Sequence, residues 1–212
     1  MFVVGGSALG PLAIEPKVNN IKIRLSVSAS ALPRLKNSIR RLDEASGDNF
    51  WHGKKRIFKR HHNFIVFRNN FVFIIFFGSG AVNITGIKDF GYITEALHTF
   101  CNTFRIKRRH IQDLLVDNVS ANGSFAHTVD LSELKRVINE RENQENKLIS
   151  SASFNPSYFP AVFCRSFAVG TILVFNSGKY NIVGAKCHSH IKEIYTEMLS
   201  VMRKLLANTK KQ

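Results

Sequence analysis

The segment FFGSGAVNITGIK, from Phe76 to Lys88, returns later in the chain as VFNSGKYNIVGAK, from Val174 to Lys186. Identical residues keep one constant spacing of 98 positions between the two copies, as positions 77 and 175 show. Among them are Phe77 and Phe175, Ser79 and Ser177, Gly80 and Gly178, Gly86 and Gly184, and Lys88 and Lys186. A long match at a fixed period indicates an internal duplication, so we expect a fold that is built twice.

Two further blocks extend the duplication towards the N-terminus. VNNIKIRLS, from Val18, aligns with VDNVSANGS, from Val116, at the same spacing, and LPRLKNSI aligns with LSELKRVI at a spacing of 99. We therefore expect a first repeat over residues 16–110 and a second repeat over residues 111–207. Residues 1–15 are expected to form a flexible N-terminal tail, and residues 208–212 a basic C-terminal tail.

Each repeat predicts the same order of elements: an alternating strand, a helix, several antiparallel strands and a longer amphipathic helix. The strands are rich in Phe, Val and Ile, and tight turns are expected at residues 69–70, 78–80 and 176–178. The long helices carry apolar stripes over residues 93–104 and 191–202. The prediction is an α+β fold in which two pseudo-symmetric repeats form one curved antiparallel sheet. Helices would cover its convex face and leave its concave face open.

Charge points to a partner that carries phosphate. Lys and Arg number 30 against 15 Asp and Glu, which gives a net charge of +15. The basic segments at residues 54–62 and 105–110 would contribute to phosphate binding, and the first would also serve as a nuclear import signal. An anionic membrane surface would fit the same charge, but the longest apolar run, residues 71–77, is too short to span a bilayer. We expect a soluble protein that does not bind membranes.

Catalytic and metal-binding chemistry find no support in the sequence. The three cysteines, Cys101, Cys164 and Cys187, have no CxxC spacing and are expected to be reduced thiols. Cys187 lies close to His188 and His190, but no matching ligand set occurs elsewhere, so no zinc is expected. There is no nucleophile–base pairing, no paired carboxylates and no phosphate-binding glycine loop. The prediction is a protein that is not an enzyme and has no cofactor.

The segment NPSYFPAVFCRSFAVGTILVFNSGKYNIVGAK, from Asn155 to Lys186, resembles the most recognisable stretch of the TATA-box-binding proteins. The resemblance rests on a proline-flanked phenylalanine, an arginine six residues later, a phenylalanine before SGK, and a GAK turn. It extends over roughly Pro16 to Leu206 and is stronger in the second repeat. It implies a saddle whose concave sheet lies in a widened minor groove, with phenylalanines wedged between base steps, as in TATA-box-binding proteins themselves.

The resemblance implies two wedging phenylalanines in each repeat. Phe159 and Phe175 occupy these positions in the second repeat, and Phe77 occupies one of them in the first. The fourth position is open. The spacing of 98 places His61 there, whereas alignment of Arg68 with Arg165 places His62 there, and Phe64 is the nearest aromatic residue.

The family also implies polar and charged contacts. Asn20 and Asn118 match two asparagines that read base acceptors at the centre of the groove, and Lys22 and Ser120 stand where the family has valine. Thr85 matches a family threonine, and Val183 stands at the equivalent position of the second repeat. Five basic residues beside the wedges are expected to contact phosphates: Arg68, Lys88, Arg165, Lys179 and Lys186. The complete set of predicted DNA-binding residues is Asn20, Lys22, Arg68, Ile75, Phe77, Thr85, Lys88, Asn118, Ser120, Phe159, Arg165, Leu173, Phe175, Lys179, Val183 and Lys186.

The leading hypothesis is a divergent TATA-box-binding-like transcription factor of eukaryotic or viral origin. It would bind double-stranded A·T-rich promoter DNA in the minor groove, bend it, and nucleate transcription initiation with general transcription factors or RNA polymerase components in the nucleus, or in the host nucleus if viral. Two alternatives stay open: a protein-interaction scaffold of the same fold, and a basic protein that binds DNA without sequence preference. The sequence also leaves open whether two chains pair as a homodimer through their concave faces when DNA is absent.

Overall fold

The computed structural model describes residues 13–46, 57–60, 64–68, 72–141 and 147–209, with β2 and β3 described by their backbone alone. The chain forms two compact units. Residues 18–119 make up the first-repeat unit, and residues 1–17 together with 120–212 make up the second-repeat unit. The two 15-residue strands β1 and β6 each contribute residues to both units.

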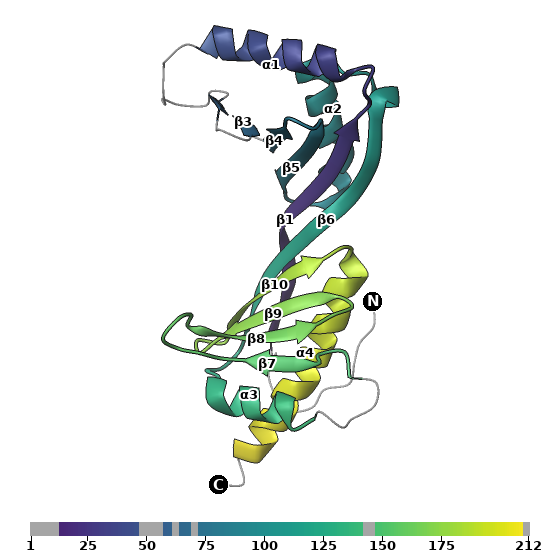
Figure 1. Ribbon diagram of the computed structural model, residues 1–212. Helices are drawn as coiled ribbons and strands as arrows, with labels where there is room; N and C mark the ends of the chain where they lie inside the picture. The colour runs from purple at the N-terminus through teal and green to yellow at the C-terminus, as the bar shows by residue number, and fades with distance from the viewer. Residues whose placement is uncertain (1–12, 47–56, 61–63, 69–71, 142–146, 210–212) are drawn as a thin grey trace. The chain divides into compact units, whose positions relative to one another are not determined.

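The repeats contain the same elements in the same order (Figure 1). The first comprises β1 (Ala13–Val27), α1 (Leu32–Ser46), β2 (Ile57–Arg60), β3 (Phe64–Arg68), β4 (Phe73–Phe77), β5 (Ala81–Ile87), the 3-10 turn η1 (Phe90–Tyr92) and α2 (Ile93–Phe104). After the 3-10 turn η2 (Arg108–His110), the second comprises β6 (Ile111–Phe125), α3 (Leu131–Asn139), β7 (Ser151–Ser153), β8 (Ala161–Ser166), β9 (Gly170–Phe175), β10 (Lys179–Ala185) and α4 (His188–Thr209). β1 begins at Ala13, within the segment that was expected to be a tail.

The described strands belong to one ten-stranded sheet in the order β2-β3-β4-β5-β1-β6-β10-β9-β8-β7. The second half of this order repeats the first half in reverse, with β6 in the place of β1. Neighbouring strands within each repeat pair antiparallel, as β1 with β5 and β8 with β9 show. The predicted α+β class and its antiparallel sheet are therefore confirmed.

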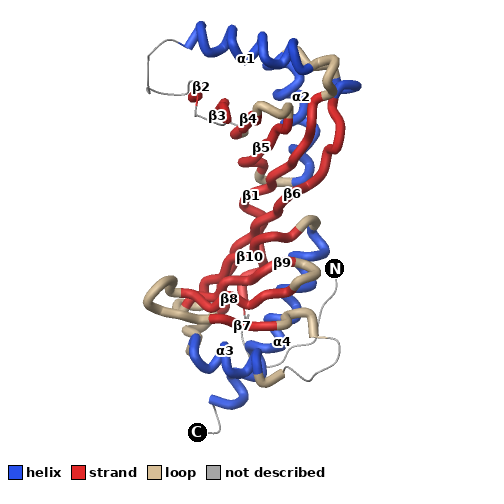
Figure 2. The backbone as a smooth tube through the Cα atoms, viewed as in Figure 1, coloured by secondary structure: helices blue, strands red, loops and turns tan. Residues whose placement is uncertain are grey.

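Helix α2 provides the core of the first-repeat unit. It packs on the sheet (Figure 2), where its Phe100 and Phe104 are completely buried and Phe76 of β4 lies 4.5 Å from Phe104 between ring centroids. Alternate residues of β1, such as Ile21 and Ile23, are buried beneath it. Each buried side chain of this size contributes about 2–3 kcal/mol of hydrophobic stabilisation. The stripe predicted for residues 93–104 is thus the core-facing side of α2.

Helix α4 has the same role in the second-repeat unit. Its Ile191, Ile194 and Met198 are completely buried, which confirms the stripe predicted for this helix. Tyr180 of β10 is also buried, and its hydroxyl donates a 2.8 Å hydrogen bond to the backbone oxygen of Ile14. Among the described residues, no helix combines the length and the apolar composition needed to cross a membrane.

The repeated Ser-Gly pairs form the turns that join the two central hairpins. Gly80 and Gly178 both have positive φ, at 92° and 80°, which is a conformation that favours glycine. Their N–H groups donate to the oxygens of Phe77 and Phe175, at 3.0 and 2.9 Å. The turn therefore fixes Phe77 and Phe175 as the last residues of their strands.

Candidate nucleic-acid interface

Strand alternation creates a second sheet surface in each unit, opposite the helices, which we call the outer face. In the first-repeat unit, exposed and half-buried side chains alternate with the core residues of β1, β4 and β5; they are Asn20, Lys22, Arg24, Phe73, Ile75, Phe77, Asn83 and Thr85. In the second-repeat unit the corresponding set is Ser120, Asn122, Phe163, Arg165, Thr171, Leu173, Phe175, Asn181 and Val183. Ile75 and Leu173, both predicted contacts, occupy equivalent positions on β4 and β9.

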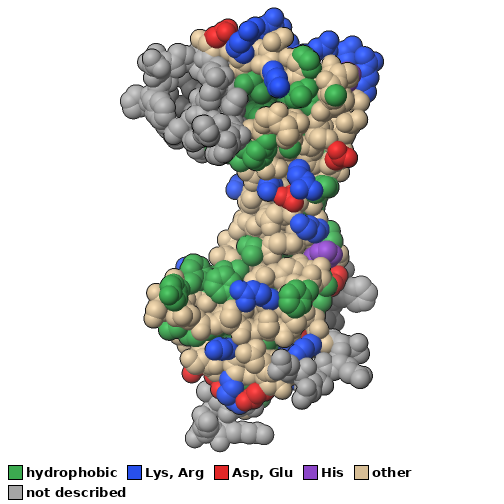
Figure 3. Space-filling model, in the orientation of Figure 1, with side chains coloured by type: hydrophobic (Ala, Val, Ile, Leu, Met, Phe, Trp, Pro, Cys, Tyr) green, Lys and Arg blue, Asp and Glu red, His purple; other side chains and the backbone are tan. Residues whose placement is uncertain are grey.

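An aromatic cluster lies on the outer face of the second-repeat unit. The ring centroids of Phe159 and Phe175 are 6.0 Å apart, and that of Phe163 is 5.3 Å from Phe159. Phe159 remains 39% exposed, although a large apolar side chain is normally withdrawn from water. Figure 3 shows hydrophobic side chains gathered where the loop between β7 and β8 meets the strands. The structure thus brings together the two phenylalanines that the sequence assigned as a wedge pair.

Phe163 is the member of this cluster that the sequence analysis missed. It stacks beneath the guanidinium of Arg165, whose Cζ lies 5.5 Å from the ring centroid. Arg165 also donates to Ser153 Oγ at 2.8 Å. The signal was present in the alternation of Phe159, Phe163 and Arg165, which places all three on one face.

The first-repeat unit presents Phe77 at the position of Phe175, with 37% of its surface exposed. In the backbone register Phe77 lies opposite Phe64, whereas Phe175 lies opposite Ala161. Phe64 therefore takes the place of Ala161 in the backbone register, and the residue that matches Phe159 stays a prediction. His61 and His62 lie outside the described residues, as do the side chains of Phe64 and Arg68.

Asn20 on β1 has an amide whose orientation is set by the protein. Its Oδ1 accepts hydrogen bonds from the Gly86 N–H at 2.7 Å and from Thr85 Oγ1 at 3.0 Å. A backbone N–H can only donate, so the atom facing it must be the carbonyl oxygen. The amide nitrogen of Asn20 is left to present its two N–H donors. Donors suit the minor-groove edge of A·T pairs, which offers only acceptors.

The second repeat lacks the threonine hydroxyl that bonds the asparagine amide in the first repeat. Val183 replaces the threonine and has no hydroxyl, and it is exposed on the outer face. Asn118 and Ser120 lie on β6 and are half-buried, each with interactions inside the protein. The two asparagines are therefore equivalent in sequence but differ in their surroundings.

Lys22, which lies on the outer face of the first-repeat unit, forms an ion pair. Its ammonium lies 2.6 Å from Asp117 Oδ2, and both side chains are largely shielded. Asp117 was not among the predicted residues, because the two positions are distant in sequence and only the pairing of β1 with β6 joins them.

The sequence predicts that all five basic residues lie beside the phenylalanines, but the structure places only some of them there. Lys179 follows the turn after Phe175 and lies beside it. The prediction is wrong for Lys88 and Lys186. They follow the ends of β5 and β10 that lie farthest from Phe77 and Phe175. Lys88 Nζ instead donates to the backbone oxygen of Asn19 at 2.9 Å, and Asn19 directly precedes Asn20. Their assignment as phosphate contacts stays a prediction.

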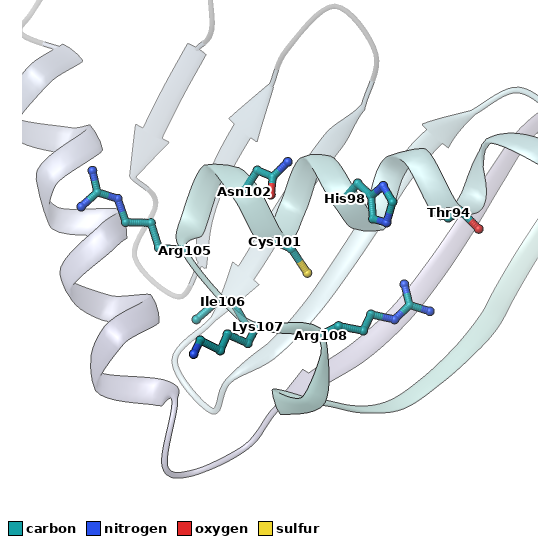
Figure 4. A pocket seen from close by; sticks show the side chains of 8 residues that line it. All are labelled: Thr94, His98, Cys101, Asn102, Arg105, Ile106, Lys107 and Arg108. Atoms are coloured by element: carbon teal, nitrogen blue, oxygen red, sulfur yellow. The ribbon is translucent and has the colours of Figure 1, made fainter.

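A separate cleft of about 720 Å³ lies on the helix side of the first-repeat unit. Figure 4 shows Cys101 projecting from α2 towards the turn that carries Lys107 and Arg108. Burial raises the pKa of the Cys101 thiol, and the charge of Arg108 offsets part of that effect. The cleft thus holds a protonated thiol among cations, and it does not adjoin the outer face.

The remaining cysteines have different environments. Cys164 is completely buried, which raises the pKa of its thiol strongly. At the start of α4, the Ser189 hydroxyl lies 3.0 Å from the sulfur of Cys187 and lowers its pKa. All three thiols are free. In the described part of the chain, no group of three or more His, Cys, Asp or Glu side chains could hold a metal ion.

Comparison with known proteins agrees with this geometry. The structure of the Methanococcus jannaschii TBP superposes with a TM-score of 0.58, covering 90% of this chain and 99% of that chain at 18% identity. The family model for "Transcription factor TFIID (or TATA-binding protein, TBP)" matches residues 113–205. The chain therefore has the TATA-binding protein fold, and its second repeat matches the family model. The match of the family model to the second repeat supports a DNA-binding role in general.

Other comparisons add little to this placement. The heterotetrameric sarcosine oxidase of Corynebacterium sp. U-96 covers 90% of this chain and 83% of its own, at 9% identity and a TM-score of only 0.33. None of the curated protein sequences matches the chain significantly. The family match is confined to the second repeat.

Proposed function

We propose that this TATA-binding protein relative binds the minor groove of A·T-rich, TATA-like promoter DNA and bends it by inserting phenylalanines between base steps. The Phe159–Phe175 pair on the outer face, with ring centroids 6.0 Å apart, carries the proposal. Two adjacent aromatic rings at an exposed strand end can enter a base step and stack on the opened faces. Unstacking costs a few kcal/mol per step, which the wider contact of a bent duplex offsets.

The outward donors of Asn20 supply the preference for A·T pairs. A guanine amino group would meet these N–H donors without an acceptor, so G·C pairs at that position lose a hydrogen bond. The net charge of +15 supplies attraction to phosphates that does not depend on sequence. The complex on promoter DNA would then recruit general transcription factors or RNA polymerase components in the nucleus, and the source of the chain would be eukaryotic or viral.

Binding and bending can be measured together. Fluorescence anisotropy with TATA, scrambled A·T-rich and G·C-rich duplexes at physiological salt gives the preference, and energy transfer between end labels gives the bend. We expect Phe159→Ala with Phe175→Ala to abolish bending and to reduce affinity for A·T-rich DNA at least about 10-fold, because base–aromatic stacking is lost. Phe167→Ala is the matched control, since Phe167 is almost fully exposed in the turn between β8 and β9.

The two alternatives give different results. Unchanged binding and bending in the double variant, with thermal unfolding like that of the unmodified protein, would favour the protein-interaction scaffold. Affinity that depends on salt but not on sequence or on the phenylalanines would favour nonspecific binding. Sedimentation without DNA would show whether two chains pair through their outer faces.

A further inference from the structure

Arg24 is an exposed cation on the outer face that was not among the predicted contacts. Its neighbours on β1, Ile23 and Leu25, are each only 1% exposed on the helix side, so strand alternation directs Arg24 to the opposite surface. Its guanidinium forms no hydrogen bond or ion pair with any residue in the described part of the chain. The cation is therefore available to a ligand of the outer face.

The place of Arg24 in the sheet favours contact with base edges. In the backbone register it lies opposite Asn83 of β5, which in turn lies opposite Ile75 of β4, a predicted base contact. β1 has β5 on one side and β6 on the other, so Arg24 stands within the sheet and not on an edge strand. Along β1 it is four residues from Asn20, and an even spacing in a strand places both on one face.

The second repeat has a different residue at the equivalent position. The spacing of 98 matches Arg24 with Asn122 of β6, which is exposed and lies on the outer face because its neighbour Ala121 is buried. No described residue forms a hydrogen bond with the Asn122 side chain, so its amide can turn either way. The first-repeat unit thus presents a permanent cation where the second-repeat unit presents a neutral amide.

The two side chains differ in the hydrogen bonds that they can make. A guanidinium has five N–H donors and no acceptor, whereas an amide has both donors and an acceptor. In the minor groove A·T pairs offer only acceptors, and a G·C pair adds the guanine amino group, which is a donor. Arg24 would therefore direct donors against a donor at a G·C pair, while Asn122 can turn its oxygen towards the amino group.

The guanidinium also suits the electrostatics of A·T-rich DNA. A-tracts have a minor groove whose enhanced negative potential attracts inserted basic side chains. A guanidinium is more weakly hydrated than the ammonium of lysine, so it loses less hydration when it leaves water for the groove. Both effects favour Arg24 as a residue that enters the groove.

We propose that Arg24 is a specificity-determining residue, which donates to the base acceptors of A·T pairs and excludes guanine from the positions that it contacts. Asn122 makes the second-repeat unit tolerant of guanine at the equivalent position. This inference rests on the proposed minor-groove binding and makes that function more specific. It predicts an asymmetric site, in which one part requires A·T pairs more strictly than the other.

Inosine provides the test, because an inosine·cytosine pair lacks the guanine amino group and is otherwise like a G·C pair. Each pair of the TATA duplex is changed in turn to G·C or to inosine·cytosine, and affinities are measured by fluorescence anisotropy. At the positions that Arg24 contacts, we expect the G·C duplex to bind about 10-fold more weakly than the inosine duplex. Arg24→Asn should reduce that ratio to about 2 or less at those positions.

The reciprocal change gives a second test. Asn122→Arg places the same cation on the second-repeat unit, and it should add a guanine penalty of about 10-fold at positions where the unmodified protein has little. Arg108→Asn is the matched control, because it removes the same charge from an exposed turn on the helix side. Any loss of affinity in this control should be equal for all duplexes, so that every ratio stays unchanged. Thermal unfolding verifies that each variant is folded.

The outcomes separate this inference from the proposed function. Guanine-to-inosine ratios that Arg24→Asn leaves unchanged at every position would overturn the role of Arg24 and leave A·T-selective binding standing. A loss of affinity that is uniform across the duplexes would do the same, because it would assign Arg24 to phosphates alone. The absence of a new penalty in Asn122→Arg would overturn the part assigned to Asn122. Failure of the unmodified protein to distinguish A·T-rich from G·C-rich DNA would overturn both the inference and the proposed function.

Discussion

The hydrogen bonds of Asn20 are already made within the protein, before any ligand is bound. Oδ1 accepts from both the Gly86 N–H and the Thr85 hydroxyl, and rotating the amide would place its N–H groups against the Gly86 N–H, which can only donate. This fixed orientation lowers the cost of ordering the side chain on binding. Asn20 thus uses its carbonyl oxygen inside the protein, and in the proposed complex its amide nitrogen would contact the bases.

Asn20→Asp is expected to separate these two roles. The carboxylate keeps an acceptor for Gly86 and Thr85, but it loses both outward donors and adds a negative charge. Affinity for A·T-rich duplexes should fall about 100-fold or more, because a pair of base contacts is lost and phosphate repulsion is gained. Anisotropy measures the affinity, and urea unfolding should show little change in stability.

Asn139 provides a contrasting control for this substitution. Its Nδ2 donates to the oxygen of Ala152 at 3.1 Å, and its Oδ1 accepts from the N–H of the same residue at 2.9 Å. Asn139→Asp should therefore reduce stability and leave DNA affinity unchanged. Undiminished binding by Asn20→Asp would contradict the role of its donors.

At the scale of elements, α3 depends on its N-cap. The Asp130 side chain accepts hydrogen bonds from the N–H groups of Ser132 and Glu133, at 2.9 and 3.0 Å. We expect Asp130→Ala to lower the free energy of unfolding by about 1 kcal/mol, measured by urea denaturation. Ser132→Ala, an exposed change in the same turn, should have almost no effect, and equal losses in both variants would argue against the cap.

The elements themselves were largely predictable from the sequence. Helical spacing identified the core-facing stripes of α2 and α4, and the Ser-Gly pairs located the hairpin turns, because local periodicity and turn chemistry act over a few residues. The aromatic pair Phe159 and Phe175 followed from the resemblance. These features depend on positions that a linear comparison of the two repeats aligns directly.

Contacts between strands were harder to predict. Lys22 and Asp117 meet only because β1 and β6 are neighbours in the sheet, and their register cannot be read from either repeat alone. Lys88 and Lys186 were placed beside the phenylalanines because they are near in sequence, but the returning strand of each hairpin carries them to its other end. Phe163 was overlooked because a phenylalanine in a strand is usually a core residue.

At the scale of the whole molecule, the excess of 15 positive charges governs how binding responds to salt. If all five basic residues assigned to phosphates make contact, log K should fall against log salt with a slope of about −4 to −5. Lys179→Gln beside Phe175 should make that slope shallower by about 1. Lys135→Gln, an exposed change on α3, should leave the slope unchanged, and equal changes in both variants would mean that the charge acts only as a diffuse field.

The two long strands, β1 and β6, each contribute residues to both units, so the chain cannot be divided cleanly between its repeats. Because the second-repeat unit includes residues 1–17, it is completed by sequence that precedes the whole first repeat, and Tyr180 is bonded to Ile14 within that segment. A fragment that begins at residue 111 would therefore contain the whole second repeat in sequence. It would lack the β1 segment that belongs to the second-repeat unit. Each unit thus includes a strand segment from the other repeat in sequence, so neither half of the chain contains a complete unit.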